Sequence, residues 1–258
     1  MKIIVLVKEV PDTYGERKLD LETGLADRAA SESVLDEISE RALEVALAHA
    51  GSADGVEVVL LSMAPESAAA TIRKGLAMGA ASAVHIADPA LAGADLGLTA
   101  RTLAAAIRRT GFDLVITGNL STDGSGGVLA AMLAELLEVP NATALSSVEI
   151  TADSVSGTRS TDDRAMRVSA PLPAVISITE ALPDARLPNF KGIMAAKKKP
   201  FETLTAADLG IEPQDLSVAS SIMTAIAEKP PRTAGVKITD EGDGGTKIAE
   251  FLIENRLA

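Results

Sequence analysis

Apolar and polar residues follow a regular order in the first 140 residues, where short apolar runs alternate with longer amphipathic stretches. The run Ile3 to Val7 is continuous and mostly β-branched, which is typical of a strand buried on both faces of a parallel sheet. Similar runs predict further strands within GVEVVLLSMAP, SAVHIAD and FDLVITGN. Helical spacing predicts helices within SVLDEISERALEVALAHA, ESAAATIRKGLAMGA, LGLTARTLAAAIRRTG and GGVLAAMLAELLEVP, the first with Val34 and Leu35 on its apolar face.

This alternation predicts an α/β fold with right-handed crossovers, a mostly parallel sheet and helices on both faces, as in Rossmann-like, adenine-nucleotide-binding domains. Sheets of this kind bind ligands beyond the carboxyl ends of their strands. We therefore expect a ligand site among three loops: Val7 to Pro11, Ser62 to Pro65 and Gly118 to Gly127.

The pattern changes after Pro140. The stretch SSVEITADSVSGTRSTDDRAMRVSAPLPAVISITE alternates apolar and polar positions between turn residues. It predicts an antiparallel addition to the sheet that ends in a buried strand, Ala174 to Ile178. Further along, TAADLGI has the pattern of a short capped helix.

The C-terminal part has the composition of an extended arm. It contains a Pro pair, Gly-rich turns and a terminal amphipathic helix, and such a segment need not pack on the rest of the chain. We expect an α/β nucleotide-binding domain over residues 1–227, which includes a loop at 183–199, and a C-terminal arm over residues 228–258.

Composition argues against several classes of function. The chain has 36 Asp and Glu against 24 Lys and Arg, so its net charge of −12 repels phosphate backbones and we expect no nucleic-acid partner. It has no cysteine, which excludes disulfides, thiolate metal ligands and cysteine nucleophiles. The two histidines, His49 and His85, are expected on a helix surface and at a sheet edge, and neither a catalytic nor a metal site is predicted.

The apolar segments are all short. None approaches the ~20 residues that span a bilayer. The N-terminal run MKIIVLVKEV is too short for a signal peptide. We therefore expect a cytoplasmic protein that is not membrane-embedded.

The loop TGNLSTDGSGG, Thr117 to Gly127, is the most suggestive ligand-binding stretch. It follows a strand and opens a helix, so its backbone N–H groups and the helix N-terminus favour a phosphate. It matches neither a Walker A sequence nor G-x-G-x-x-G. A plain glycine-rich turn, with Asp123 and Ser125 capping the helix, is an equally good interpretation. Asp36 is either a helix N-cap, with Glu37 in the first turn, or a contact for an adenosine bound across the strand ends, and the residues alone favour the N-cap.

Positive charge is concentrated in LPNFKGIMAAKKKP, residues 187–200, behind an apolar tip built on Phe190. The lysines form a solvated run whose stems cover apolar surface, or they steer acidic partner surfaces, and sequence leaves both interpretations open.

Six motifs now occur in one order over nearly the whole length: VKEVPDT, TIRKGLAMGA, GNLSTDG, LPAVISITE, GIMAAKKK and PPRTAGVK. In this combination the chain resembles the β subunit of electron transfer flavoprotein, in the actinobacterial style. The resemblance implies a heterodimer in which FAD lies mainly on the α subunit, while the β subunit buries a structural AMP and wraps the α subunit with its arm. It implies an electron carrier, not an enzyme, which takes electrons from acyl-CoA and related dehydrogenases and passes them to a membrane quinone oxidoreductase.

The resemblance also implies site residues. Thr13 and Tyr14 fall where the family approaches the flavin ring. A recognition loop before GIMAAKKK would anchor dehydrogenases through one apolar side chain, here Phe190. Its partner-binding residues would be Phe190, Lys191, Ile193, Met194, Lys197, Lys198 and Lys199. The AMP contacts would be Leu6, Asp36, Glu37, Ile38, Ser39, Met63, Gly118, Asn119, Ser121, Thr122, Asp123, Gly124, Ser125, Gly126, Gly127, Val128 and Leu129.

The chain departs from the family at several of these positions. Asn119 and Leu120 stand where Lys-Gln is usual, and Val128 stands where Gln occurs, which leaves side-chain contacts to the phosphate open. The loop also departs from that of electron-bifurcating relatives, which hold a second FAD in place of AMP, so a one-flavin carrier is favoured. Ser160 replaces a Glu that resembles a partner for the moving domain of the α subunit, and its effect on domain closure is open.

Two alternatives remain beside the simple carrier. One is an electron-bifurcating flavoprotein subunit with a second FAD. The other is a stand-alone adenine-nucleotide-binding protein of the universal-stress type, for which a long C-terminal arm has little purpose.

Overall fold

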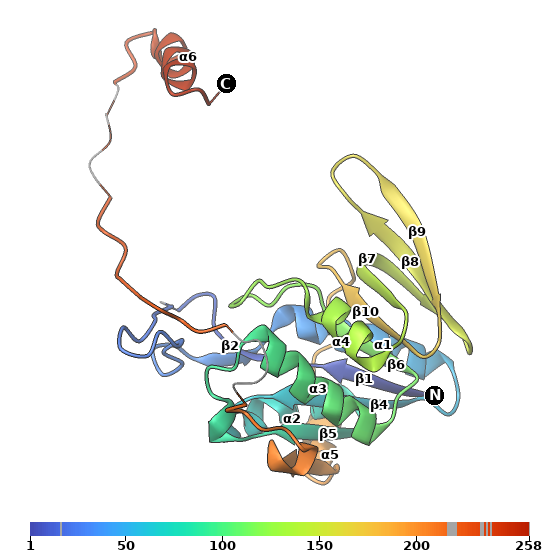
Figure 1. The fold of residues 1–258 in the computed structure, drawn as a ribbon. Coiled ribbons are helices and arrows are strands. Elements are labelled where there is room, and N and C mark those ends of the chain that lie inside the picture. Colours follow the sequence, from blue (N-terminus) through green and yellow to red (C-terminus); the bar gives the residue numbers. More distant parts are fainter. Residues whose placement is uncertain (16, 216–220, 233–234, 236, 238, 258) are drawn as a thin grey trace. The chain divides into compact units, whose positions relative to one another are not determined.

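The four strands predicted in the first 140 residues lie side by side in one sheet (Figure 1). The computed structural model describes residues 1–15, 17–215, 221–232, 235, 237 and 239–257. The chain divides into two compact units, Met1–Thr224 and Ala225–Ala258. Within the described residues, the main sheet has nine strands, in the order β11-β5-β4-β1-β6-β10-β7-β8-β9.

The strands of the main sheet are, in chain order, β1 (Lys2–Leu6), β4 (Glu57–Met63), β5 (Ser82–Ile86), β6 (Leu114–Gly118), β7 (Asn141–Ile150), β8 (Ser154–Ser160), β9 (Ala165–Pro171), β10 (Ala174–Ile178) and β11 (Phe201–Leu204). A separate small sheet pairs β2 (Glu9–Pro11) with β3 (Ser33–Leu35). The helices are α1 (Glu37–Ser52), α2 (Ala69–Met78), α3 (Leu96–Thr110), α4 (Leu129–Leu137), α5 (Phe190–Ala196) and α6 (Gly244–Glu254). Short 3₁₀ turns are η1 (Glu66–Ala68), η2 (Pro89–Leu91) and η3 (Ala207–Leu209).

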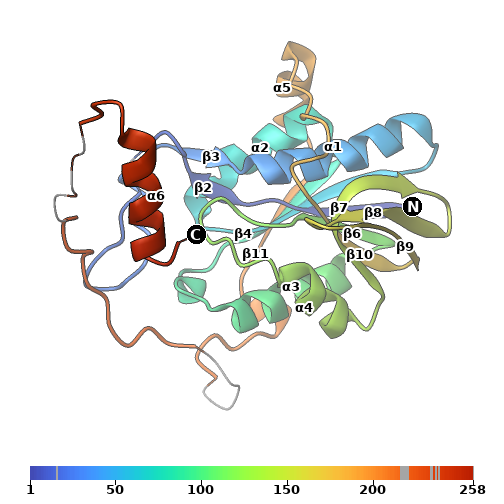
Figure 2. The ribbon, with the colours of Figure 1, turned by 90° about the horizontal axis from the view of Figure 1, so that it is seen from above.

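The strands from β11 to β7 pair in parallel, and β7–β8 and β8–β9 pair antiparallel. Helices α1 and α2 cover one face of the parallel part, and α3 and α4 cover the other (Figure 2). β1 contributes to both cores: Ile3 and Val5 pack with the α1 side, while Ile4 packs with the α3 side. The predicted α/β class, with its mostly parallel sheet and antiparallel addition, is therefore confirmed.

The beginning of the first predicted helix is wrong. Val34 and Leu35 belong to β3, where Val34 pairs with Val10 and Leu35 with Glu9, and α1 begins only at Glu37. Two apolar residues just before a helix are compatible locally with a helical turn or with a strand. Pairing with β2 makes them a strand.

The prediction for His85 is also wrong. It lies on β5, between β4 and β11, and is almost fully buried instead of lying at a sheet edge. Its Nε2 is 3.0 Å from the carbonyl oxygen of Ala64. The strand at this edge of the sheet is β11. The sequence pattern did not reveal it, because only four of its residues pair with β5.

The antiparallel addition differs in one respect from the prediction. β10 does not end an antiparallel run but lies between β6 and β7, in parallel with both, so the added antiparallel strands are β8 and β9. The short helix predicted in TAADLGI is the turn η3.

The second unit contains α6, on which Ile248, Phe251 and Ile253 are exposed. Part of the PPRTAGVK motif, at 233–234 and 236, lies outside the described residues. Among the described helices, none combines the length and apolar character that crossing a membrane requires.

Candidate functional site

The sheet order reverses beside β1. From β1 the chain builds β4 and then β5 on one side, and later β6 and β10 on the other. At the carboxyl ends of β1 and β6, the loops that follow these two strands therefore run in opposite directions. The crevice between such loops is the usual place for a ligand in an open α/β sheet. A cavity of about 600 Å³ lies there.

Most of the residues proposed to contact a nucleotide line this cavity, although they come from four separate segments. They are Leu6, Asp36, Ile38, Ser39, Met63, Gly118, Asn119, Ser121, Gly124, Gly126, Gly127 and Leu129. Five others lie next to the lining residues but are not part of the lining: Glu37, Thr122, Asp123, Ser125 and Val128. Tyr14 is also outside it, with 99% of its side chain exposed, and Thr13 is exposed.

The cavity also has lining residues that sequence reasoning missed. Lys8 follows β1 and lies in the loop Val7 to Pro11, which was expected to border the ligand site, but it was not named as a contact. Leu25 and Arg28 come from the excursion between β2 and β3, residues 12–32, which has no periodic pattern to identify them. A third group comes from the segment around η2 and the start of α3.

Asp36 connects the start of α1 to the loop after β6. It is fully buried, and its Oδ2 accepts a hydrogen bond of 3.0 Å from the backbone N–H of Thr122. It occupies the predicted N-cap position of α1, with Glu37 in the first turn, although its side chain makes no cap hydrogen bond. Its Oδ1 is buried and has no hydrogen-bond partner among the described residues. Burial raises the pKa of Asp36, and the Thr122 N–H opposes that rise.

Asp123 is held by two cations. Lys8 Nζ lies 2.6 Å from Asp123 Oδ1, and Arg28 Nη2 lies 3.9 Å from its Oδ2. Burial acts to raise the pKa of Asp123, but the hydrogen bond and charge of Lys8, with hydrogen bonds from Ser121 and Gly124, outweigh burial and hold this pKa below its usual value. Neither Asp123 nor Ser125 caps the following helix, because α4 begins at Leu129 with Val128 as its N-cap.

The loop after β6 uses several of its backbone N–H groups within the protein. The N–H of Thr122 donates to Asp36, the N–H of Gly124 donates to Ser121 Oγ and Asp123 Oδ1, and that of Ser125 donates to the Ser121 carbonyl. These bonds fix the loop. They also reduce the number of backbone donors that remain for a phosphate.

Gly118 brings α1 close to the end of β6. A Cβ built on Gly118 would stand 2.6 Å from Cγ2 of Ile38, closer than real Cβ contacts. A larger residue here would push Ile38, a cavity-lining residue, away from its place.

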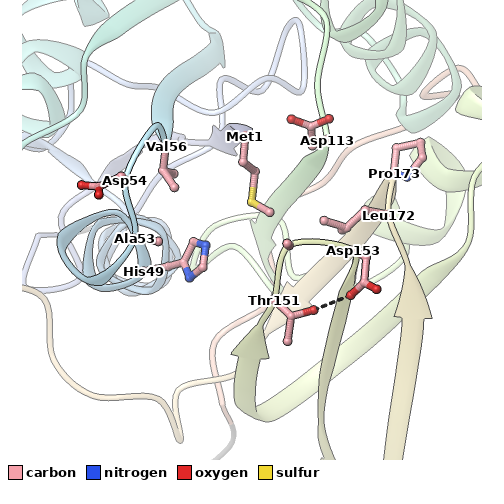
Figure 3. Close-up of a pocket in the computed structure, with 11 residues that line it drawn as sticks. Met1, His49, Ala53, Asp54, Val56, Asp113, Thr151, Asp153, Leu172 and Pro173 are labelled. Carbon is pink, nitrogen blue, oxygen red and sulfur yellow. Dashed lines mark hydrogen bonds between the residues drawn. The ribbon is translucent and has the colours of Figure 1, made fainter.

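A second cavity, of about 550 Å³, lies at the amino ends of the strands, against Met1, the end of α1 and the turn between β7 and β8 (Figure 3). Asp113 there accepts a hydrogen bond of 2.7 Å from the backbone N–H of Lys2, and Asp153 accepts one from Thr151. Because α/β sheets bind ligands at the carboxyl ends of their strands, we place the candidate site in the first cavity. Within the described part of the chain, no cluster of His, Cys, Asp or Glu could hold a metal ion.

A separate surface is formed by the predicted loop 183–199, which we call the docking segment after the role expected for it. Its apolar side chains Leu187 and Phe190 are 85% and 80% exposed, and Ile193 and Met194 are about half exposed. Leu187 was not singled out from the sequence, although it directly precedes the Pro-Asn that leads into α5.

The docking segment is nevertheless firmly attached. Arg186 forms two hydrogen bonds of 2.8 Å with the carboxylate of Glu44 on α1. Asn189 Oδ1 accepts the N–H of Gly192 at 2.8 Å and so caps α5. At the other end, Arg73 on α2 donates to the carbonyl of Ala196 at 3.0 Å.

The four lysines of this segment do not share one role. Lys191, Lys197 and Lys198 are exposed. Lys199 is partly buried, and its Nζ donates to the carbonyls of Leu76, at 2.8 Å, and Ala80, at the end of α2. Burial lowers the pKa of Lys199.

Comparison with known proteins agrees with the sequence motifs. A family model for the electron transfer flavoprotein domain matches residues 23–209. The chain is 45% identical over 262 residues to the electron transfer flavoprotein subunit beta of Mycobacterium tuberculosis, covering 99% of this chain and 98% of that protein. It is 33% identical to the subunit beta of Thermoanaerobacterium thermosaccharolyticum, covering 90% and 89%. It is 32% identical to subunit CarD of the caffeyl-CoA reductase-Etf complex of Acetobacterium woodii, covering 91% and 90%.

The family model covers four of the six motifs, the match to the Mycobacterium tuberculosis protein extends over nearly the whole chain, and together they confirm the resemblance stated from the sequence. Electron transfer flavoproteins bind FAD, and a β subunit implies an α subunit as its partner. The chain belongs to the electron transfer flavoprotein family as a β subunit, an electron-transport component of a heterodimeric flavoprotein.

Proposed function

We propose that the chain is the β subunit of a one-flavin electron carrier that accepts electrons from acyl-CoA and related dehydrogenases and delivers them towards a membrane quinone oxidoreductase. FAD is held mainly by the α subunit, and the β subunit performs no bond-making step itself. The observation that carries this proposal is the near full-length similarity to β subunits, together with a docking segment that is exposed yet firmly attached. We place the protein in the cytoplasm.

AMP is the proposed occupant of the cavity at the carboxyl ends of β1 and β6. Three features support a nucleotide there: the switch-point position, the cationic side chain of Arg28, and the buried Oδ1 of Asp36 that has no partner among the described residues. A buried acceptor without a partner is costly, so a ligand hydroxyl or amine that donates to it would be stabilising. When bound, AMP would be a structural group that ties the loop after β6 to α1.

The docking segment is the proposed contact for dehydrogenases. An exposed aromatic side chain on a fixed support is a typical interface anchor. Phe190 meets this description, and the aliphatic side chain of Leu187 is equally exposed. Lys191, Lys197 and Lys198 remain available to steer an acidic partner surface, whereas Lys199 is engaged with α2.

The C-terminal arm, residues 228–258, is the proposed contact for the α subunit. Helix α6 exposes Ile248, Phe251 and Ile253, which is a large apolar surface for one helix. Covering these side chains with the α subunit would remove that surface from water. Tyr14 and Thr13 are the proposed β-side neighbours of the flavin.

A second candidate is an electron-bifurcating subunit with a second FAD in the cavity. The similarity to a subunit of a caffeyl-CoA reductase-Etf complex favours keeping it. A stand-alone nucleotide-binding protein of the universal-stress type is disfavoured, because the similarity to β subunits includes the arm as well as the α/β domain.

Cofactor stoichiometry tests the proposal directly. The chain is co-expressed with an α partner, and FAD and AMP are measured after denaturation of the purified complex. One FAD and one AMP per heterodimer, with reduction of the flavin by an acyl-CoA dehydrogenase and its substrate, is the expected result. Two FAD and no AMP would establish the bifurcating alternative, and a colourless homodimer that hydrolyses ATP would establish the nucleotide-binding one.

A further inference from the structure

The cavity at the switch point has three charged lining residues among those described: Lys8, Arg28 and Asp36. Asp123 stands just behind them and contacts both cations. Cations at the mouth of such a cavity favour an anionic ligand, but they contribute only if their charge is not already used by the protein.

Lys8 is largely committed to the protein. Its Nζ lies 2.6 Å from Asp123 Oδ1 and 3.4 Å from Ser121 Oγ. An ammonium group has three donors, and two of them face these acceptors. Lys8 therefore acts mainly as the support of the loop after β6.

Arg28 is much less engaged. Its Nη1 donates to the carbonyl of Glu9 at 3.3 Å, and its Nη2 is 3.9 Å from Asp123 Oδ2, which is beyond hydrogen-bond length. A guanidinium carries five N–H donors in a planar fork that matches phosphate oxygens. Most of the binding capacity of Arg28 therefore remains for a ligand.

The loop after β6 increases the need for such a side chain. Because the N–H groups of Thr122, Gly124 and Ser125 donate within the protein, the loop cannot present all of its backbone donors to a phosphate. The α4 N-terminus is preceded by Gly126 and Gly127, which line the cavity but carry no charge. The charge that a phosphate requires must come from elsewhere.

The excursion 12–32 is placed to supply it. Arg17 donates to the carbonyl of Thr122, and Arg28 to that of Glu9, so the two arginines attach this segment to both loops at the switch point. Attachment through backbone carbonyls leaves the excursion in place whether or not the cavity is filled.

We propose that Arg28 is the phosphate-binding side chain of the cavity, and that it selects a nucleoside monophosphate over the nucleoside. This inference rests on the proposed AMP site. A bound phosphate, with a higher charge than the Asp123 carboxylate and no competing lysine, would take Arg28 as its own partner. Lys8 would continue to neutralise Asp123.

The test compares AMP with adenosine, which lacks the phosphate, by calorimetric titration of nucleotide-free heterodimer. The variants are Arg28→Gln, Arg28→Lys and, as a matched control, Arg167→Gln on β9, whose ion pair with Glu149 is exposed. Arg28→Gln should weaken AMP roughly ten- to a hundredfold, the loss expected for charged hydrogen bonds, and leave adenosine unchanged. Arg28→Lys should restore part of the AMP affinity, and Arg167→Gln should behave like wild type.

The possible failures are distinct. If Arg28→Gln weakens AMP and adenosine by the same factor, Arg28 only attaches the excursion and the inference is wrong. If it weakens neither, the phosphate is held by other groups and the inference is again wrong. If the wild-type heterodimer binds neither AMP nor adenosine, the AMP site itself is wrong, and the role of Arg28 is rejected with it.

Discussion

Gly192 of α5 rests directly on the backbone of Ala77 near the end of α2: a Cβ built on Gly192 would stand 2.2 Å from the carbonyl oxygen of Ala77. Backbone is the least yielding kind of neighbour, so any larger residue must move α5 as a whole. This contact fixes how close α5, which begins at Phe190, lies to α2.

Replacing Gly192 by Ala should therefore displace α5. We expect a loss of about 1–3 kcal/mol, typical of overpacking, measured as a lower unfolding free energy of the chain in its heterodimer. Electron transfer from a dehydrogenase should become less efficient at low partner concentration. Gly51→Ala in α1 is the matched control, because a Cβ there meets nothing within 4 Å. Equal behaviour of the two variants would show that the contact with Ala77 does not position the segment.

Phe190→Ala should weaken docking of the dehydrogenase without loss of flavin. An exposed anchor that enters a pocket typically contributes about 2 kcal/mol or more, so the KM of a dehydrogenase for its electron carrier should rise about thirtyfold. The maximal rate should change little, since the residue is remote from electron transfer in this assignment. Leu187→Ala tests the neighbouring side chain in the same way, and Met166→Ala on β9 serves as an exposed control. An unchanged KM for Phe190→Ala would remove the anchor role from this residue.

Lys199 and Lys198 should behave differently although they are adjacent. Lys199→Met leaves the carbonyls of Leu76 and Ala80 without their donor and should cost about 1–2 kcal/mol of stability. Lys198→Met removes an exposed charge, so it should leave stability unchanged and reduce the salt dependence of dehydrogenase association. Unfolding curves and association rates at two salt concentrations separate these effects. A stability loss in Lys198→Met equal to that in Lys199→Met would contradict the assignment.

Sequence reasoning recovered the parts of the fold that depend on local pattern. The continuous run Ile3 to Val7 correctly indicated a strand buried on both faces, because its successive side chains pack alternately into the two cores. The strand-end loops followed from the order of elements. For the same reason the candidate cavity could be placed at Gly118 to Gly127 before its lining was known.

What sequence missed depends on contacts between distant residues. Nothing in the composition of the excursion 12–32 indicates that Arg28 reaches Glu9 and the vicinity of Asp123. The role of Lys199 depends on α2, more than a hundred residues earlier in the chain. Val34 and Leu35 joined β3 because a partner strand was available, which no local helix pattern can reveal.

Asp123→Asn should destabilise the chain at neutral pH. Burial acts to raise the pKa of Asp123, but Lys8, together with hydrogen bonds from Ser121 and Gly124, outweighs burial and lowers this pKa, so the folded state favours the ionised carboxylate. A lowered pKa contributes stability above the unfolded value, and this contribution is lost as pH falls through the folded pKa. The difference in melting temperature between wild type and Asp123→Asn should therefore shrink in acid. The exposed Asp54→Asn is the control, and a difference that does not depend on pH would exclude the ion pair as its cause.

Asp36→Asn should have the opposite pH dependence. Burial raises the pKa of Asp36, so the ionised carboxylate costs stability at neutral pH, and the cost disappears as pH falls below both the folded and the unfolded pKa. An Asn retains an acceptor for the Thr122 N–H, so nucleotide-free Asp36→Asn should melt higher than wild type at neutral pH, with a gain that vanishes in acid.

The same substitution should weaken nucleotide binding, since the proposed AMP site uses the buried oxygen of Asp36 that has no described partner. Stability would then rise while affinity falls, a combination that general damage to the fold cannot produce. Melting curves from about pH 4 to about pH 8, spanning the usual carboxyl range, and AMP titrations of the same heterodimer provide both measurements. If Asp36→Asn melts lower than wild type at neutral pH, the carboxylate is stabilised by groups other than those described here, and its assignment to the nucleotide must be abandoned.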